Sequence, residues 1–213
     1  PELTLAERRK ICRILDTDML SDIFEHIDQK QAAEYLDEMD VKKAAAILSA
    51  METDAVVDVL KMTSKEKRSL LTELLDDDAK KDIAVIAAFD EDEIGSWMTT
   101  NCIVIRENLT VKQAMSSLVE QAAKNDNIST IFMVTEDQTF YGAMDLKDLI
   151  IARQDSALED LIVTSYPYVY GHELIDDCIE KLKDYSEDSI PVLNNNNKLL
   201  GVITSQSIEI GRA

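Results

Sequence analysis

Carboxylates are the side chains of this sequence whose chemistry is most evident. Acidic residues number 42 against 22 basic residues, which gives a formal net charge of −20. Compact acidic domains repel themselves, and a bound or condensed cation relieves that repulsion. Asp54 and Asp58 stand one helical turn apart and would project from the same face of a helix. Taken singly, each of these carboxylates is equally explained as part of a solvated acidic surface that keeps the protein soluble.

Other reaction chemistry has no recognisable motif here. The sequence contains no P-loop, GxGxxG, GxSxG or HExxH pattern, so an enzyme is not expected. Cys12, Cys102 and Cys178 form no CxxC pair and lie far from His26 and His172 in the sequence. This argues against a zinc site or a disulfide framework and favours a reducing, cytoplasmic setting. The acidic surface also disfavours nucleic acid, because binding to phosphates depends on Lys and Arg.

No segment predicts a membrane span. The longest strictly apolar run, Ile83–Phe89, is far shorter than the roughly 18 residues that a spanning helix needs. The chain starts at Pro1 rather than Met and stops at Ala213, as an excised soluble fragment would.

The first half of the chain carries a short internal repeat. An apolar residue followed by a polar one recurs at nearly regular intervals, at Ile27-Asp28, Met39-Asp40, Met51-Glu52, Met62-Thr63, Leu75-Asp76 and Phe89-Asp90. Each unit has apolar residues at helical spacing, as in Ile23/Ile27. Such short amphipathic helices must stack on their neighbours to bury their apolar stripes. The repeat predicts a superhelical stack of short helices, and Asp76–Asp78 is expected to cap one of them.

The second half is duplicated with strand-like runs. Ile131–Val134 followed by Tyr141–Asp145 matches Ile190–Leu193 followed by Leu200–Thr204, and both pairs of blocks have the same offset. Each copy reads as strand, helix, strand, polar turn, strand and helix, with Ile103–Ile105 opening the first. Capping boxes are expected at Thr4/Glu7, Thr110/Gln113 and Ser156/Glu159.

This duplication resembles the CBS module, which usually occurs as a tandem pair. The stretch Asp90–Thr99 is similar to the acidic junction between the helical and CBS domains of MgtE-type magnesium transporters. The resemblance covers nearly the whole chain. It implies an α + α/β fold, with an N-terminal superhelical stack of short helices (1–94) followed by a tandem CBS-domain pair (95–155 and 156–213).

The resemblance also implies metal ligands. Asp22 and Asp54 fall where the helical domain of the family offers carboxylates, and Gly95 falls where the family offers a backbone carbonyl. Asp58 would share the ion of Asp54.

In the second CBS copy the match to the family is less complete. Asp184 and Glu187 lie near a position that the family uses for metal. Gln206 and Ser207 stand where paired aspartates are expected, which leaves open whether a site bridging to Asp54 is kept.

CBS pairs often bind adenine nucleotides, so ATP is a possible cofactor. The resemblance assigns Asp148 to ribose hydroxyls and Lys147 to phosphate, with Asp145 in place of the usual hydroxyl residue. Capping of the last helix by Asp145 is an equal alternative. Ser207 replaces the ribose-binding Asp in the second copy, so at most one site is expected.

The function implied is that of a magnesium-sensing regulatory region at the cytoplasmic face of the cell membrane. Ions bridging the acidic helical and CBS domains would close them together and hold shut a transmembrane pore domain that follows residue 213. The family implies a homodimer through the CBS modules, here through helices 111–123 and 174–184. The alternative is an adenine-nucleotide-sensing CBS protein with a protein-interaction helical domain.

Overall fold

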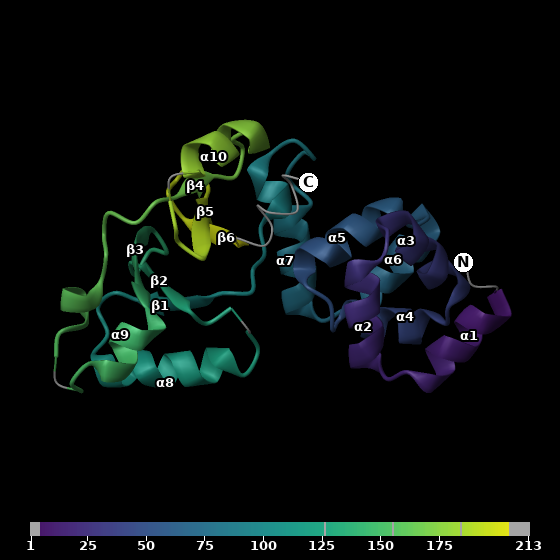
Figure 1. The fold of residues 1–213 in the computed structure, drawn as a ribbon, viewed down its shortest axis with the longest axis horizontal. Helices are drawn as coiled ribbons and strands as arrows, with labels where there is room; N and C mark the ends of the chain where they lie inside the picture. The colour runs from purple at the N-terminus through teal and green to yellow at the C-terminus, as the bar shows by residue number, and fades with distance from the viewer. Residues whose placement is uncertain (1–4, 126, 155, 184, 205–213) are drawn as a thin grey trace. The chain divides into compact units, whose positions relative to one another are not determined.

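The computed structural model describes residues 5–125, 127–154, 156–183 and 185–204. The chain divides into two units, Pro1–Ala87 and Ala88–Ala213. The first is built from helices alone in its described part, and the second contains both sheets (Figure 1). The acidic junction that starts at Asp90 belongs to the second unit.

Short helices separated by tight breaks form the first unit. They are α1 (Leu5–Ile14), α2 (Thr17–His26), α3 (Gln29–Glu38), α4 (Val41–Leu48), α5 (Thr53–Met62), α6 (Lys65–Leu74) and α7 (Asp77–Ile86). Helices of 8 to 10 residues are marginal in isolation and need tertiary packing. Alternate helices along the chain pack together, namely α2 with α4, α3 with α5, α4 with α6 and α5 with α7. The predicted superhelical stack is confirmed.

The breaks between these helices carry N-cap residues at a nearly regular interval. Side chains accept hydrogen bonds from backbone N–H groups of the following turn at Asp16, Asp28, Asp40, Ser64 and Asp76. Each such cap stabilises its helix by about 1 kcal/mol. Glu52 falls at the same interval but makes no capping hydrogen bond. Part of the acidic charge of this unit is therefore a capping device, as predicted for Asp76.

The second unit repeats one arrangement of strands and helices. The first copy contains η1 (Ile94–Trp97), β1 (Ile103–Arg106), α8 (Val111–Ala122), β2 (Thr130–Val134), β3 (Phe140–Asp145) and α9 (Leu146–Ile151). The second contains η2 (Leu158–Leu161), β4 (Val169–Tyr170), α10 (Ile175–Leu182), β5 (Ser189–Leu193) and β6 (Leu199–Thr204). The strand-like runs predicted from the sequence all form strands.

Each copy has its own three-stranded sheet. The orders are β1-β2-β3 and β4-β5-β6, with the first pair parallel and the second antiparallel in both. Both antiparallel pairs carry a register shift at the same point, between Met133 and Val134 and between Val192 and Leu193. The duplication seen in the sequence is therefore a structural duplication.

The opening segment of each copy pairs with the other copy. Thr99 bridges Val202 in β6, and Val163 bridges Ala143 in β3. Phe132, Ala143 and Val202 lie in one buried cluster, so the two copies share a core.

Of the predicted capping boxes, one is confirmed and one is wrong. The Thr110/Gln113 capping box at the start of α8 is confirmed. The Ser156/Glu159 box is wrong, because the chain there forms the short 3₁₀ helix η2 with Ala157 at its N-cap. Thr4 lies outside the described residues. No helix in the described part of the chain is long and apolar enough to cross a membrane.

Candidate functional site

The helical unit carries three of the proposed metal ligands on two helices. Asp22 is exposed on α2, while Asp54 and Asp58 lie on α5. The side chain of Asp54 lies outside what the structure describes. Asp58 Oδ2 accepts a hydrogen bond from Gln29 Nε2 at 2.9 Å, and Oδ1 lies 3.8 Å from Lys61 Nζ. An ion at Asp58 would have to compete with these two neighbours.

A further acidic pair, Glu25 and Glu52, lies near Asp22 and was not identified from the sequence. Glu25 Oε1 accepts the backbone N–H of Glu52 at 2.7 Å, which ties α2 to the start of α5. Burial raises the pKa of Glu25, and the negative charges of Glu52 and Asp22 raise it further. Asp22, Glu25 and Glu52 therefore form an acidic patch close to the first turn of α5, where Asp54 lies. A cation there would relieve the repulsion between these carboxylates, which adds to the effect of burial on this pKa.

Glu25→Gln is expected to make the helical unit slightly more stable at pH 7 in the absence of Mg²⁺. The carboxamide oxygen can still accept the Glu52 N–H, while the disfavoured charge is removed. Because the folded-state pKa of Glu25 is raised, wild-type stability is full below the unfolded pKa and falls as pH rises through the folded pKa. The gain should therefore vanish near pH 4. Urea unfolding at both pH values measures it.

The exposed Glu34→Gln on α3 is the matched control, since it removes one charge that is not among the causes of the raised pKa of Glu25. A loss of stability in Glu25→Gln at pH 7 would contradict the prediction.

Gly95 lies in the short helix η1 within the acidic junction. It is buried, and its N–H donates to the carbonyl of Gly171 at 2.9 Å. The junction is thus attached to the second CBS copy, which positions the Gly95 peptide.

The second CBS copy holds a carboxylate with an unsatisfied oxygen. Glu187 Oε2 is buried and has no hydrogen-bond partner among the described residues. Burial raises the pKa of the neighbouring Tyr166 to about 12, and the charge of Glu187 contributes in the same direction. A buried carboxylate oxygen without a partner is costly, and a cation or a donor would satisfy it. Asp184, Gln206 and Ser207 lie outside the described residues.

The proposed nucleotide contacts lie together where β3 passes into α9. Asp145 is the N-cap residue of α9, is exposed and makes no capping hydrogen bond. Lys147 is exposed, and Asp148 is half-buried in the first turn. The capping alternative for Asp145 is therefore not realised as a side-chain hydrogen bond, and one short segment offers two carboxylates and one ammonium group.

An aromatic pocket in the second copy was not foreseen. Its volume is about 330 Å³, and it is lined by Ser165, Tyr166, Pro167, Tyr168, Tyr170, Lys181, Leu182 and Tyr185. Four of the six tyrosines of the chain thus meet at one place. The ring of Tyr168 packs edge-on against the ring of Tyr170, with 5.6 Å between the two centroids. Lys181 Nζ lies 6.0 Å from the centroid of the Tyr168 ring. Such rings can stack on a planar ligand.

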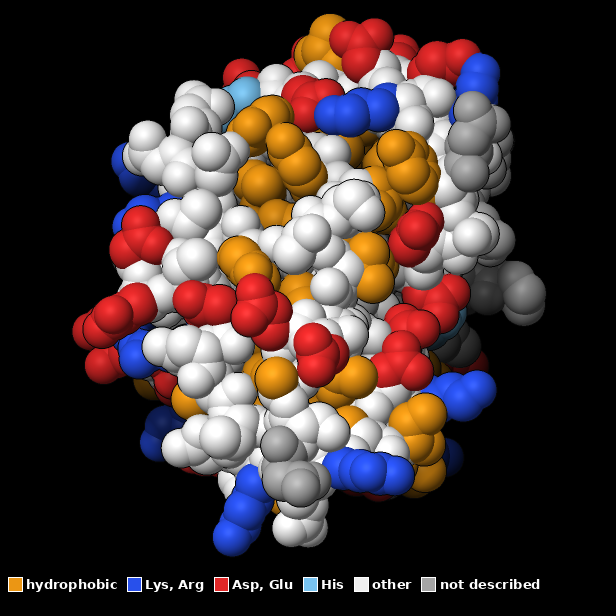
Figure 2. Space-filling view, turned by 90° about the vertical axis from the view of Figure 1, so that its left-hand side faces the viewer, with side chains coloured by type: hydrophobic (Ala, Val, Ile, Leu, Met, Phe, Trp, Pro, Cys, Tyr) orange, Lys and Arg blue, Asp and Glu red, His pale blue; other side chains and the backbone are white. Residues whose placement is uncertain are grey.

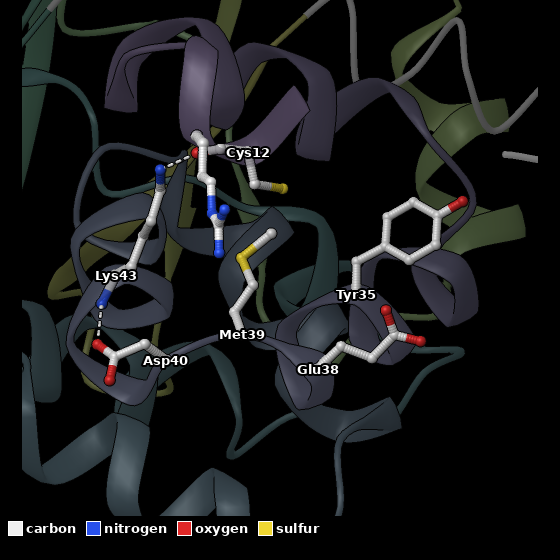
Figure 3. A pocket seen from close by; sticks show the side chains of 7 residues that line it. Cys12, Tyr35, Glu38, Met39, Asp40 and Lys43 are labelled. Atoms are coloured by element: carbon white, nitrogen blue, oxygen red, sulfur yellow. Dashed lines mark hydrogen bonds between the residues drawn. The ribbon is translucent and has the colours of Figure 1, made fainter. Parts of the chain in front are cut away.

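A smaller pocket lies in the helical unit between α1, α3 and α4 (Figure 3). Its volume is about 240 Å³ and its lining includes Cys12, Tyr35 and Met39. Lys43 Nζ donates to the carbonyl of Cys12. Burial raises the pKa of the Cys12 thiol, which keeps it protonated and poorly nucleophilic. The pocket shows no arrangement suited to covalent chemistry.

Within the described ranges, no three His, Cys, Asp or Glu side chains are grouped so as to hold a metal ion.

Comparisons with known proteins match both units. The model of the MgtE intracellular N domain matches residues 1–92. The model of the CBS domain matches residues 93–155 and 158–208.

Curated relatives match along the chain. The magnesium transporter MgtE of Thermus thermophilus is 30% identical over 210 residues, which cover 97% of this chain and 47% of the relative. The magnesium transporter MgtE of Bacillus subtilis is 21% identical over 210 residues, covering 87% and 47%. The chain spans about half the length of these two relatives.

Solved structures show the same fold. The soluble part of a magnesium transporter superposes with a TM-score of 0.88 at 27% identity, covering 99% of this chain and 83% of that one. The cytosolic domain of the Mg²⁺ channel MgtE in complex with ATP gives a TM-score of 0.91 at 24% identity, covering 98% and 86%. The chain belongs to the MgtE family, as an MgtE N domain followed by a CBS pair, homologous over nearly its whole length to the cytosolic region of that magnesium transporter.

Proposed function

We propose that this chain senses magnesium and regulates a transmembrane magnesium pore that belongs to the same protein. The observation that carries the proposal is charge. A chain homologous over 97% of its length to a magnesium transporter has a formal net charge of −20, and exposed carboxylates lie along its helices. Compact acidic surfaces repel themselves, and bound cations relieve that repulsion.

The proposed mechanism is electrostatic. At low magnesium the acidic faces of the helical domain and the CBS pair repel and separate. At high magnesium, ions at Asp22, Asp54, Asp58, the Gly95 carbonyl, Asp184 and Glu187 bridge the two domains, and the closed assembly holds the pore shut. The ion shifts the equilibrium because it binds the closed state better. No catalytic step is involved.

Millimolar Mg²⁺ is expected to reduce the radius of gyration of the chain, while K⁺ at matched ionic strength is not. Small-angle X-ray scattering across a titration measures this. A specific sensor responds to the divalent ion at one midpoint, whereas general screening responds to ionic strength alone.

Asp22→Asn and Asp54→Asn should move that midpoint to higher magnesium. Asp37→Asn is the matched control, since Asp37 is an exposed carboxylate on α3 outside the proposed set. Equal shifts in all three variants, or no compaction of the wild type, would sink the proposal.

Dimerisation through the CBS modules is part of the same proposal. Val119 on α8 and Ile150 and Ile151 on α9 are 65%, 60% and 70% exposed, and α8 packs beside α9. Figure 2 shows apolar side chains gathered between acidic ones on one face of the molecule. Exposed apolar surface of this kind is typical of interaction sites.

Nucleotide sensing is the second candidate function. Its support is the segment Asp145–Asp148, the tyrosine-lined pocket and the ATP-bound relative of the same fold. If magnesium leaves the scattering unchanged while ATP binds in the micromolar range by calorimetry, nucleotide sensing replaces magnesium sensing as the function.

A further inference from the structure

The acidic junction is attached to the second CBS copy by a strand-like ladder. Glu93 forms an antiparallel bridge with Leu174. Backbone hydrogen bonds extend the ladder on both sides, from Ile94 N to Glu173 O (2.8 Å), from Gly95 N to Gly171 O (2.9 Å) and from Ile175 N to Asp92 O (3.0 Å). The junction therefore has a fixed register on the loop that precedes α10.

One aromatic ring packs against the glycines of this ladder. A Cβ atom added to Gly95 would lie 2.5–2.7 Å from three atoms of the Phe89 ring, and one added to Gly171 would lie 2.6 Å from two others. Phe89 is 8% exposed, so the ring is buried in this position. Only glycine at both positions allows the ring and the two backbones to approach so closely.

A polar pair holds the outer side of the same ladder. Glu93 Oε1 lies 2.8 Å from His172 Nδ1, and Glu93 Oε2 accepts the backbone N–H of Asp90 at 2.8 Å. The His172 ring lies 4.9 Å from the Phe89 ring, centroid to centroid. Phe89, Glu93 and His172 thus contact one another or the ladder, and they are called the junction latch below.

The first CBS copy shows which part of this arrangement the fold itself requires. Thr110 of the first copy bridges Ala157 at the opening of the second, as Leu174 of the second copy bridges Glu93 at the opening of the first. Both residues of the bridge are related by one offset along the chain, which is longer than the offset between the duplicated strand blocks. Glu107 is the equivalent of Gly171 in the first copy. The N–H of Glu107 donates to the carbonyl of Val134 and that of Gly171 to the carbonyl of Leu193, and these acceptors are the last residues of β2 and β5.

The residues of the junction latch have no counterparts around the Thr110–Ala157 bridge. At the offset that relates the two bridges, Arg153 replaces Phe89 and is exposed. The bridge therefore belongs to the CBS pair, whereas the phenylalanine packed on two glycines is an addition at the acidic junction.

We propose that the junction latch positions the Gly95 peptide for magnesium, with Phe89, Glu93 and His172 acting as positioning residues rather than ligands. This inference rests on the proposed function, in which the Gly95 carbonyl is a ligand. A carbonyl held in place beforehand loses less conformational freedom when it binds an ion. Residues behind a metal ligand commonly change affinity by about tenfold or more when they are removed.

The test compares Glu93→Ala with Glu91→Ala in the whole chain. Both variants remove one carboxylate from the junction, so both reduce its negative charge by one. Only Glu93 contacts His172 and the Asp90 N–H through its side chain. Glu93→Ala is expected to speed amide hydrogen exchange at Ile94 and Gly95 by about tenfold without magnesium. It should also raise the magnesium concentration at the midpoint of compaction about tenfold, whereas Glu91→Ala should raise it much less.

Phe89→Ala should reproduce both effects without any change in charge, and Glu93→Gln, which keeps one acceptor oxygen, should recover part of the affinity. Faster exchange at Gly95 with an unchanged magnesium midpoint would overturn the positioning role while leaving the sensor proposal intact. A wild-type chain that does not respond to magnesium would instead remove the proposed function. Equal midpoint shifts in Glu91→Ala and Glu93→Ala would reduce the latch to a charge effect and overturn it as well.

Discussion

Gly142→Ala and Gly201→Ala should each destabilise the entire CBS pair by about 2–3 kcal/mol, as overpacking of a well-packed site does. A Cβ atom at Gly142 would lie 2.6 Å from the carbonyl oxygen of Val163, and one at Gly201 would lie 2.6 Å from that of Thr99. Both clashes are with backbone, which cannot rotate away as a side chain can. Each glycine lies where the opening segment of one copy crosses the sheet of the other.

Because of that crossing, damage in one copy should reach the other. Val163 and Ala143 exchange two hydrogen bonds of 2.8 and 3.2 Å, and Thr99 and Val202 exchange two of 2.9 Å. Hydrogen exchange should therefore show β2 and β5 losing protection together in either variant. Ala123→Ser, at the exposed end of α8, is the control. Loss of protection confined to the copy that carries the substitution would contradict the shared fold.

Much of this architecture follows from local pattern and internal repetition. The offset between the duplicated strand blocks places Gly142 and Gly201 at equivalent points in the sequence alone. The same offset relates Gln138 and Asn197, both with positive φ, 68° and 58°, at the turns between the antiparallel strands. Turn residues, caps and strand runs depend on neighbours in the chain, which is why the sequence indicates them.

The parts of the site that depend on long-range contacts were not predicted. Glu93 meets His172 across 79 residues, and Glu25 meets the backbone of Glu52 across 27. Neither pair has a sequence pattern, because each depends on how separate elements pack. For Glu25, the one signal in the sequence was its position one helical turn after Asp22 on the same helix.

Some of the acidic residues counted in the net charge have a structural role as helix N-caps. Asp28, Asp40 and Asp76 recur in step with the helical repeat because each begins a helix. A periodic carboxylate is explained by capping, so candidate ligands are better sought at positions such as Asp22 that fall outside the period.

Leu36→Ala is expected to destabilise the helical unit by about 2–5 kcal/mol, the usual cost of removing a buried leucine side chain. Leu36 on α3 is 0% exposed within the core of that unit. The helices are too short to persist without that packing, so the whole stack should unfold together. Leu70→Ala on α6 is the matched control, since Leu70 is 50% exposed and its truncation should cost much less. Chemical denaturation followed by helical circular dichroism measures both.

The same variant separates scaffold from ligand. If magnesium binds the folded helical unit, the ion at about ten times its dissociation constant should stabilise that unit by about 1.4 kcal/mol. This increment should be the same in wild type and in Leu36→Ala, because Leu36 belongs to the core and not to the acidic surface. An Asp22→Asn background should reduce the increment without reproducing the loss of stability. If Leu36→Ala abolished the increment while the unit stayed folded, the ion would depend on the packing of the core, and the assignment of Asp22 as a surface ligand would fail.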